Sequence, residues 1–100
     1  MNQYQLVSQP LADLDVEAAF LWYESQVPEL GTECIEQLRA KYDRIVSGPF
    51  RYQDLRSGIR HALLRRFLYA VLFALENRAI VVLAVLHAGR DAAEWQRRRS

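Results

Sequence analysis

The residues of this chain that could take part in chemistry are mostly arginines, concentrated in its second half. Residues 51–100 contain ten arginines and four acidic residues, whereas residues 1–50 contain three basic and eight acidic residues. The halves therefore carry about −5 and +6 charges by direct count. This asymmetry indicates either an anionic partner for the second half, such as nucleic acid or an acidic protein segment, or attraction between the halves within the fold.

Three arginines accompany a predicted strand that begins near Ile59. Because side chains of a strand alternate between its faces, Arg60 and Arg66 share one face with Leu64, while Arg65 points to the other. Two guanidinium groups on one face could bind carboxylates of an acidic segment. An ordinary charged outer face explains the pattern equally well.

Polar residues also follow the last apolar run, where His87 is succeeded by Arg90 and Asp91. His87 is a candidate general base, but no nucleophile or acidic partner is specified by spacing, so a role in fixing the following turn is favoured. Asp91 fits the N-cap of a short terminal helix. Arg90 could pair with Asp91 or with a carboxylate of a partner.

The chain ends in a basic arm of residues 95–100, which begins with Trp95 and contains three consecutive arginines. Such an arm is usually mobile, and it could reach DNA or a protein target. The alternative is a solvated end, with Trp95 closing the core.

Other chemistry is not indicated. No metal-ligand spacing, phosphate-binding loop or Ser/Cys–His arrangement occurs in the sequence, so neither a metal nor a cofactor is expected. The single cysteine, Cys34, cannot form an internal disulfide and is expected to be a buried, inert thiol. His61 is expected to be partly exposed. Residues 80–86 are too few to cross a membrane, and no apolar segment follows Met1, so a cytoplasmic protein without an export signal is expected.

The apolar pattern predicts where these residues are held. Three strand-like runs occupy about 58–67, 68–76 and 79–87, and the two-residue break at 77–78 predicts that the last two pair antiparallel. Residues 80–86 are apolar without alternation, as in a strand covered on both faces. A further short strand is predicted at 3–8, and residues 50–58 are expected to be a loop.

Two helices are predicted over residues 11–26 and 30–46, ended by Pro28 and Gly48. The predicted core-facing stripe of the first comprises Leu14, Ala18, Leu21 and Trp22. That of the second comprises Leu30, Cys34, Leu38, Tyr42 and Ile45. The expected fold is one α+β domain of order β-α-α-β-β-β over residues 1–100, with a helical hairpin on one face of a mainly antiparallel sheet and a short C-terminal helix. The other face would be open and carry part of the arginine set, and the strand with Arg60 would be an edge.

Four segments, in order and spacing, resemble a known family. They are LADLDVEAAFLWYE (11–24), ELGTECIEQLRAKYDRIVSGPFRY (29–52), RHALLRRFLYAVLF (60–73) and VVLAVLHAGRD (81–91). Together they resemble the ParE branch of the ParE/RelE superfamily, the toxins of bacterial type II toxin–antitoxin operons, also called plasmid stabilisation system proteins. The resemblance implies the same α+β fold.

The resemblance also implies partners. A cognate ParD-like antitoxin from the same operon would form a hetero-oligomer with the toxin, and operator DNA would be contacted only through the antitoxin. The target implied for the ParE branch is DNA gyrase. Candidate antitoxin-binding residues are Tyr23, Arg60, Leu64, Arg66 and Arg90. Candidate target-binding residues are His87, Arg90, Trp95, Arg97, Arg98 and Arg99.

Two alternatives stay open. RelE relatives are ribosome-dependent mRNA endonucleases, and the resemblance places their functional arginines and tyrosine at about Ala70, Gly89 and Trp95. None of these residues can stabilise the scissile phosphate or transfer a proton during RNA cleavage, although a small shift in register would bring in Arg90. We therefore expect a binding toxin and not an enzyme. A non-toxic member that acts only in antitoxin binding and autoregulation is the other alternative.

Overall fold

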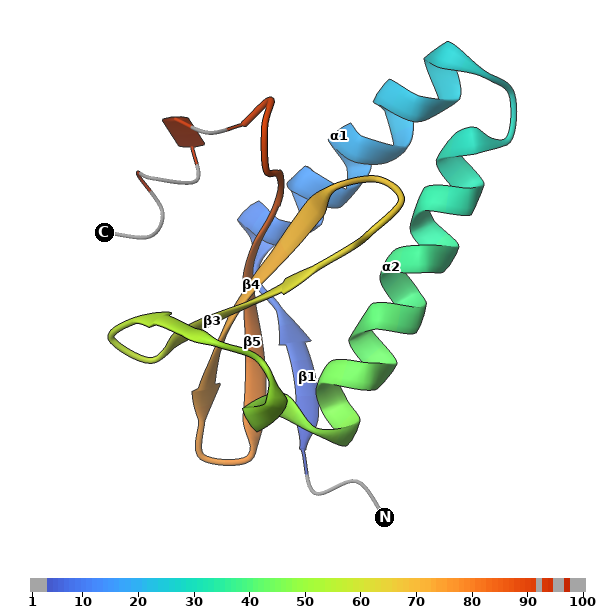
Figure 1. Ribbon diagram of the computed structural model, residues 1–100. Helices are drawn as coiled ribbons and strands as arrows, with labels where there is room; N and C mark the ends of the chain where they lie inside the picture. The colour runs from blue at the N-terminus through green and yellow to red at the C-terminus, as the bar shows by residue number, and fades with distance from the viewer. Residues whose placement is uncertain (1–3, 92, 95–96, 98–100) are drawn as a thin grey trace.

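The computed structural model describes residues 4–91, 93–94 and 97, and shows two helices packed on one face of a five-stranded sheet (Figure 1). The elements in chain order are β1 (Gln5–Ser8), α1 (Pro10–Gln26), α2 (Leu30–Ser47), the 3-10 helix η1 (Pro49–Arg51), β2 (Asp54–Arg56), β3 (Ile59–Leu63), β4 (Tyr69–Glu76) and β5 (Ala79–His87). The predicted α+β class and helical hairpin are confirmed. Neither described helix is long and apolar enough to cross a membrane.

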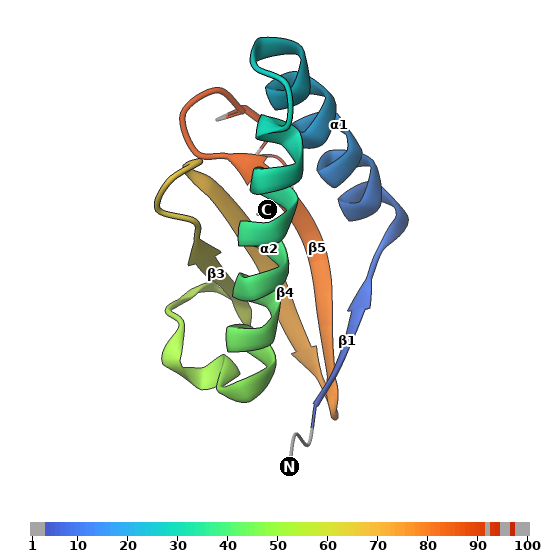
Figure 2. The same cartoon turned by 90° about the vertical axis from the view of Figure 1, so that its right-hand side faces the viewer.

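The sheet has the strand order β1-β5-β4-β3-β2. β1 is parallel to β5 and the other neighbours are antiparallel, so the predicted mainly antiparallel sheet is confirmed. The β4–β5 turn is tight because Asn77 takes a left-handed conformation, with a φ of 58°. Figure 2 shows β1 along one side of the sheet and α2 crossing its face.

The strand carrying Arg60 is not an edge, contrary to prediction. Residues 54–56, expected to lie in a loop, form β2 and pair with β3 through a turn in which Ser57 and Gly58 have positive φ. A three-residue polar strand has too little apolar alternation to be recognised in a sequence. The short β2 therefore forms one edge of the sheet and β1 forms the other.

The predicted strand through residues 58–67 is also too long. β3 ends at Leu63, and Arg65 and Arg66 lie in the turn that leads to β4 instead of on a strand face. The chain turns here because Leu64 enters the core and Leu68 has a φ of 55°.

A bulge in β5 decides which side chains face the helices. Leu72 pairs with Ala84, but Phe73 pairs with Val82, so Leu83 is the extra residue. After the bulge Val85 joins the helix-side core, and His87 pairs with Tyr69, another residue of that core.

Both faces of the central strands are covered. On the face away from the helices, Leu72, Ala84 and Leu86 form a second buried cluster. The prediction for residues 80–86 is thus confirmed, whereas the prediction of an open face carrying arginines is wrong. Arg60 pairs with Phe73 and lies on the helix side.

The two helices differ in how well their cores were predicted. In α2, Cys34, Leu38 and Ile45 are buried as expected. In α1 the predicted stripe is wrong, because Leu14, Leu21 and Trp22 are exposed. The core contacts of α1 come from the opposite face, through Ala12, Val16, Ala19 and Tyr23.

Candidate functional site

The turn that follows β5 is built around His87. The Nδ1 atom of His87 accepts hydrogen bonds from the backbone N–H groups of Gly89, at 3.2 Å, and Arg90, at 2.8 Å. The Asp91 carboxylate accepts a bond from the His87 backbone N–H at 2.8 Å, while the Asp91 N–H donates to the His87 carbonyl at 2.9 Å. One ring nitrogen of His87 is therefore committed to holding the turn, as its predicted structural role requires.

The Asp91 carboxylate closes the turn back onto β5, and its predicted N-cap role stays a prediction because the start of the terminal helix lies partly outside the described residues. Ala93, Glu94 and Arg97 are helical. The helix predicted near the C-terminus otherwise involves residues outside those that the structure describes.

Arg90 connects this turn to α1 and β4. Its guanidinium lies 4.6 Å from the centre of the Trp22 ring and 5.6 Å from that of Tyr69, and it donates a hydrogen bond to the Tyr69 hydroxyl. Burial raises the pKa of Tyr69 to about 12, although the Arg90 charge opposes this shift. The His87 ring packs edge-on against Tyr69 at 5.3 Å, so the three side chains form one cluster.

An open hollow of about 340 Å³ lies beside this cluster, between α1, β5 and the turn. Asp15, Asp91 and Glu94 contribute carboxylates to its lining, together with Arg90 and Trp22. Asp15 reaches β5 where β1 no longer covers it, because β1 pairs only as far as Val82, and its carboxylate accepts a bond from the Val85 N–H at 3.0 Å. Three carboxylates around one guanidinium suit a polar or basic protein surface better than a phosphate backbone.

The predicted target-binding residues are only partly brought together. His87 and Arg90 lie in the turn, and Arg97 forms an ion pair with Glu94 at the rim of the hollow. Trp95, Arg98 and Arg99 lie outside the described residues.

The predicted antitoxin-binding residues do not form one surface. Arg60 donates to the Tyr52 carbonyl at 2.6 Å and lies 5.0 Å from the Phe50 ring, at the end of the sheet near η1. Leu64 is buried in the helix-side core and offers no exposed face, so the strand alternation that paired it with exposed arginines was misleading.

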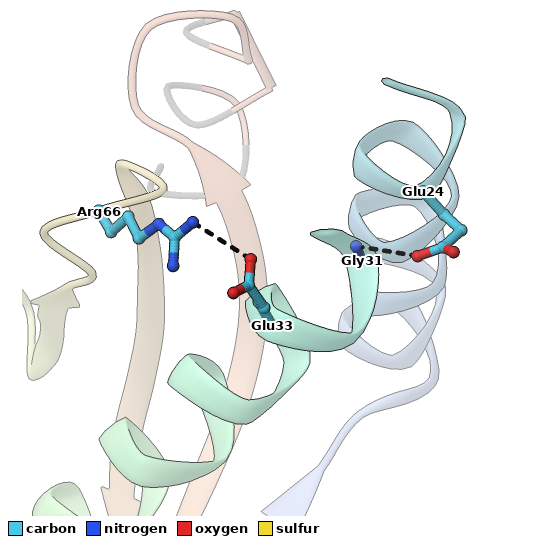
Figure 3. A network of polar contacts seen from close by, with 4 residues as sticks. All are labelled: Glu24, Gly31, Glu33 and Arg66. Atoms are coloured by element: carbon cyan, nitrogen blue, oxygen red, sulfur yellow. Dashed lines mark hydrogen bonds and ion pairs between the residues drawn. The ribbon is translucent and has the colours of Figure 1, made fainter. Parts of the chain in front are cut away.

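Arg66 and Tyr23 lie at the other end of the sheet. Arg66 pairs with Glu33 of α2 at 3.2 Å, and both side chains are about half exposed (Figure 3). The Tyr23 hydroxyl donates to the Phe67 carbonyl at 3.2 Å, and its ring lies 6.0 Å from Tyr69. Tyr23 therefore lies between Arg66 and the cluster that contains Arg90.

Sequence reasoning missed Tyr69, Asp15 and the exposed position of Trp22. A tyrosine at the start of an apolar strand predicts core, and the bulge that aligns Tyr69 with His87 leaves no recognisable signal in the sequence. Cys34 is buried, as predicted, and burial raises the pKa of its thiol. His61 is half-buried. Within the described part of the chain, no three His, Cys, Asp or Glu residues are placed to hold a metal ion.

Comparison with known proteins supports the fold. No protein-family model and no curated protein matches the sequence. A solved chain from the chromosomal ParDE TA system of P. aeruginosa has a TM-score of 0.76 and 16% identity, over 85% of this chain and 96% of that one. A chain from the toxin–antitoxin complex RelBE2 of Mycobacterium tuberculosis has a TM-score of 0.58 and 21% identity, over 84% of this chain and 96% of that one. The predicted ParE/RelE-like fold is therefore confirmed.

Proposed function

We propose that this chain is the toxin of a type II toxin–antitoxin system, of the ParE type. It acts in the cytoplasm by binding DNA gyrase and blocking replication, and a ParD-like antitoxin from the same operon neutralises it. The observation that carries the proposal is the likeness of the fold, along nearly the whole chain, to a chain of a ParDE system. The four sequence segments that resemble the ParE branch support it independently.

The site favours binding over catalysis. Cleavage of RNA needs cations beside the scissile phosphate and a free general base. The hollow has more carboxylates than guanidinium groups in its described lining, and His87 uses Nδ1 to hold backbone N–H groups. The pKa of Tyr69, raised to about 12 by burial, keeps its hydroxyl protonated at neutral pH.

A RelE-type ribonuclease is the second candidate, and one observation favours it. Tyr69, His87 and Arg90 meet beside the hollow, and each is a residue type that such chemistry uses. Cleavage of mRNA by the purified protein on translating ribosomes would support this candidate. A non-toxic member predicts instead that expression without the antitoxin leaves growth unaffected.

The test of gyrase inhibition compares three purified proteins in a supercoiling assay. We expect the complete chain to abolish supercoiling and to accumulate cleaved DNA. An Arg90→Ala variant should lose inhibition because Arg90 holds the turn against Trp22 and Tyr69. An Arg39→Ala variant, changed at an exposed position of α2, is the matched control and should inhibit normally. Unaffected gyrase at high concentrations of the complete chain would contradict the proposal.

A truncation after Glu94 tests the basic arm separately. Loss of inhibition in the truncated chain would place part of the activity in residues 95–100. Retained inhibition would assign the activity to the turn and the hollow alone.

A further test asks whether the solubility of the toxin depends on its antitoxin. Arg66 can exchange Glu33 for a carboxylate of an antitoxin at little cost, because exposed ion pairs contribute about 0–1 kcal/mol to stability. The antitoxin should raise the solubility of the co-expressed toxin, and equal solubility in both preparations would count against the proposed neutralisation. Operator DNA should be retained only by the complex, through the antitoxin.

A further inference from the structure

The outer face of α1 carries a largely exposed apolar stripe, and the Arg90 guanidinium lies over the Trp22 ring at one end of it. Leu11, Leu14, Leu21 and Trp22 are exposed by 56%, 60%, 57% and 45%. These residues and Ala18 share one side of the helix, because their spacings of three, four, seven and eleven residues return to the same face. From Leu11 to Trp22 the stripe is about 17 Å long at the usual rise of a helix.

The stripe is separate from the side of α1 that packs against the core. The core side is formed by Ala12 and Ala19, which are buried, with Val16 and Tyr23 beside them. Large exposed leucines at helical spacing are costly to leave in water, and contiguous exposed apolar surface commonly marks a contact with another protein.

The charges beside the stripe restrict what can cover it. α1 contains four carboxylates and no basic residue. Helix geometry places Glu17 and Glu24 along one border of the stripe and Asp15 along the other. A second copy of this chain would bring two equally acidic helices together, and nucleic acid or an anionic lipid surface would be repelled by the same charges.

We propose that the stripe binds a basic amphipathic helix of a partner protein. Leucine-type side chains of that helix would cover Leu11, Leu14 and Leu21, while lysines or arginines on its borders would face exposed carboxylates such as Glu17. A helix fits because the surface is straight and about three turns long. The proposal rests on exposure and charge alone, and it does not depend on what the chain inhibits.

The test is a selection from a displayed library of amphipathic helical peptides with constant leucines and randomised border residues. The complete wild-type chain is the bait. A counter-selection against a Leu14→Ser/Leu21→Ser variant then discards peptides that bind elsewhere on the chain. Both leucines are more than half exposed, so the variant should fold, which circular dichroism and thermal unfolding check. The matched control is Leu63→Ser, which changes a similarly exposed apolar residue on β3.

We expect the selected peptides to have lysine or arginine at their borders. They should bind the double variant at least about tenfold more weakly, since burying each leucine contributes about one factor of ten or more. Binding to Leu63→Ser should be unchanged, and Glu17→Lys should weaken it. Selected peptides with acidic or neutral borders would overturn the proposal. So would a selection in which every peptide binds the double variant as tightly as the wild-type chain. Self-association of the wild-type chain that is abolished in the double variant would also overturn it, in favour of a homodimer.

Discussion

The two helices of the hairpin are similar in length, yet they use their large apolar residues in opposite ways. α2 has 18 residues and turns Cys34, Leu38 and Ile45 into the core. α1 has 17 residues and turns its leucines outward, while Ala12 and Ala19 face the core. Periodicity shows that a helix has an apolar face, but it does not show whether that face meets the core or a partner.

Close packing explains why alanine is found on the inner side of α1. This helix lies against both β5 and α2, and small side chains let helix axes approach. The approach is close where α1 meets the start of α2. A Cβ atom added at Gly31 would lie 2.6 Å from the Phe20 carbonyl oxygen. α2 therefore supplies most of the large buried side chains of the helical layer, whereas the outer face of α1 carries the exposed stripe for which we propose a partner.

The largest effect is expected in the core of α2. Leu38 is 4% exposed, so Leu38→Ala should lower the free energy of unfolding by about 2–5 kcal/mol through lost burial and an unfilled cavity. Urea denaturation followed by circular dichroism measures this change. A loss below about 1 kcal/mol would show that α2 is not the main helical contributor to the core.

The helix junction should be the next most sensitive position. Gly31→Ala places a methyl group against the Phe20 backbone, which cannot yield as a side chain would, and should cost about 1–3 kcal/mol. Gly89→Ala is the matched control, because its Cβ would meet only His87 atoms at ordinary contact distances of 3.6 and 3.7 Å. Equal stability of the two variants would rule out the close approach of α1 and α2.

A smaller effect is expected where α1 caps α2. The Glu24 carboxylate accepts bonds from the Glu29 N–H at 2.9 Å and the Gly31 N–H at 3.0 Å, at the start of α2 (Figure 3 shows the second bond). Glu24→Ala should lower the free energy of unfolding by about 1 kcal/mol, as for loss of a helix cap. Glu17→Ala removes an exposed carboxylate without such bonds in the described chain, and should change stability by less than about 0.5 kcal/mol.

Tyrosine burial in α2 predicts a dependence on alkaline pH. Burial raises the pKa of Tyr42 to about 12, and the charges of Asp13 and Asp15 act in the same direction. The unfolded chain releases this proton near pH 10 and the folded chain only near pH 12, so stability is complete below about pH 10 and falls as the pH rises. Unfolding titrations from pH 9 upward should show a shallower fall in Tyr42→Phe than in wild type. Parallel curves would contradict the burial of this hydroxyl.

The sequence was sufficient for the parts of the fold that depend on local patterns. The two helices, the β4–β5 turn at Asn77 and the doubly covered strand at 80–86 were all predicted correctly. β2 and the turn at 64–68 were missed, since pairing in the sheet stabilises them and no strong local signal marks them.

The candidate site was harder to predict for two physical reasons. A single extra residue at Leu83 sets the face on which His87 lies, and a bulge of this kind has no strong sequence signal. The inward or outward direction of the α1 stripe depends on which face packs more closely, which is a property of tertiary contacts. His87 and Arg90 were nevertheless predicted, because both lie at or just after the end of the last apolar run, in the segment VVLAVLHAGRD that resembles the family.

The most direct measurement is therefore urea unfolding of a Leu14→Ala/Leu21→Ala double variant beside Leu38→Ala. Two leucines are lost in the first protein and one in the second. Because Leu14 and Leu21 are more than half exposed, we predict that the double variant loses less than about 1 kcal/mol, well below the loss in Leu38→Ala. A loss in the double variant equal to or above that of Leu38→Ala would place the stripe in the core and contradict its role as a binding surface.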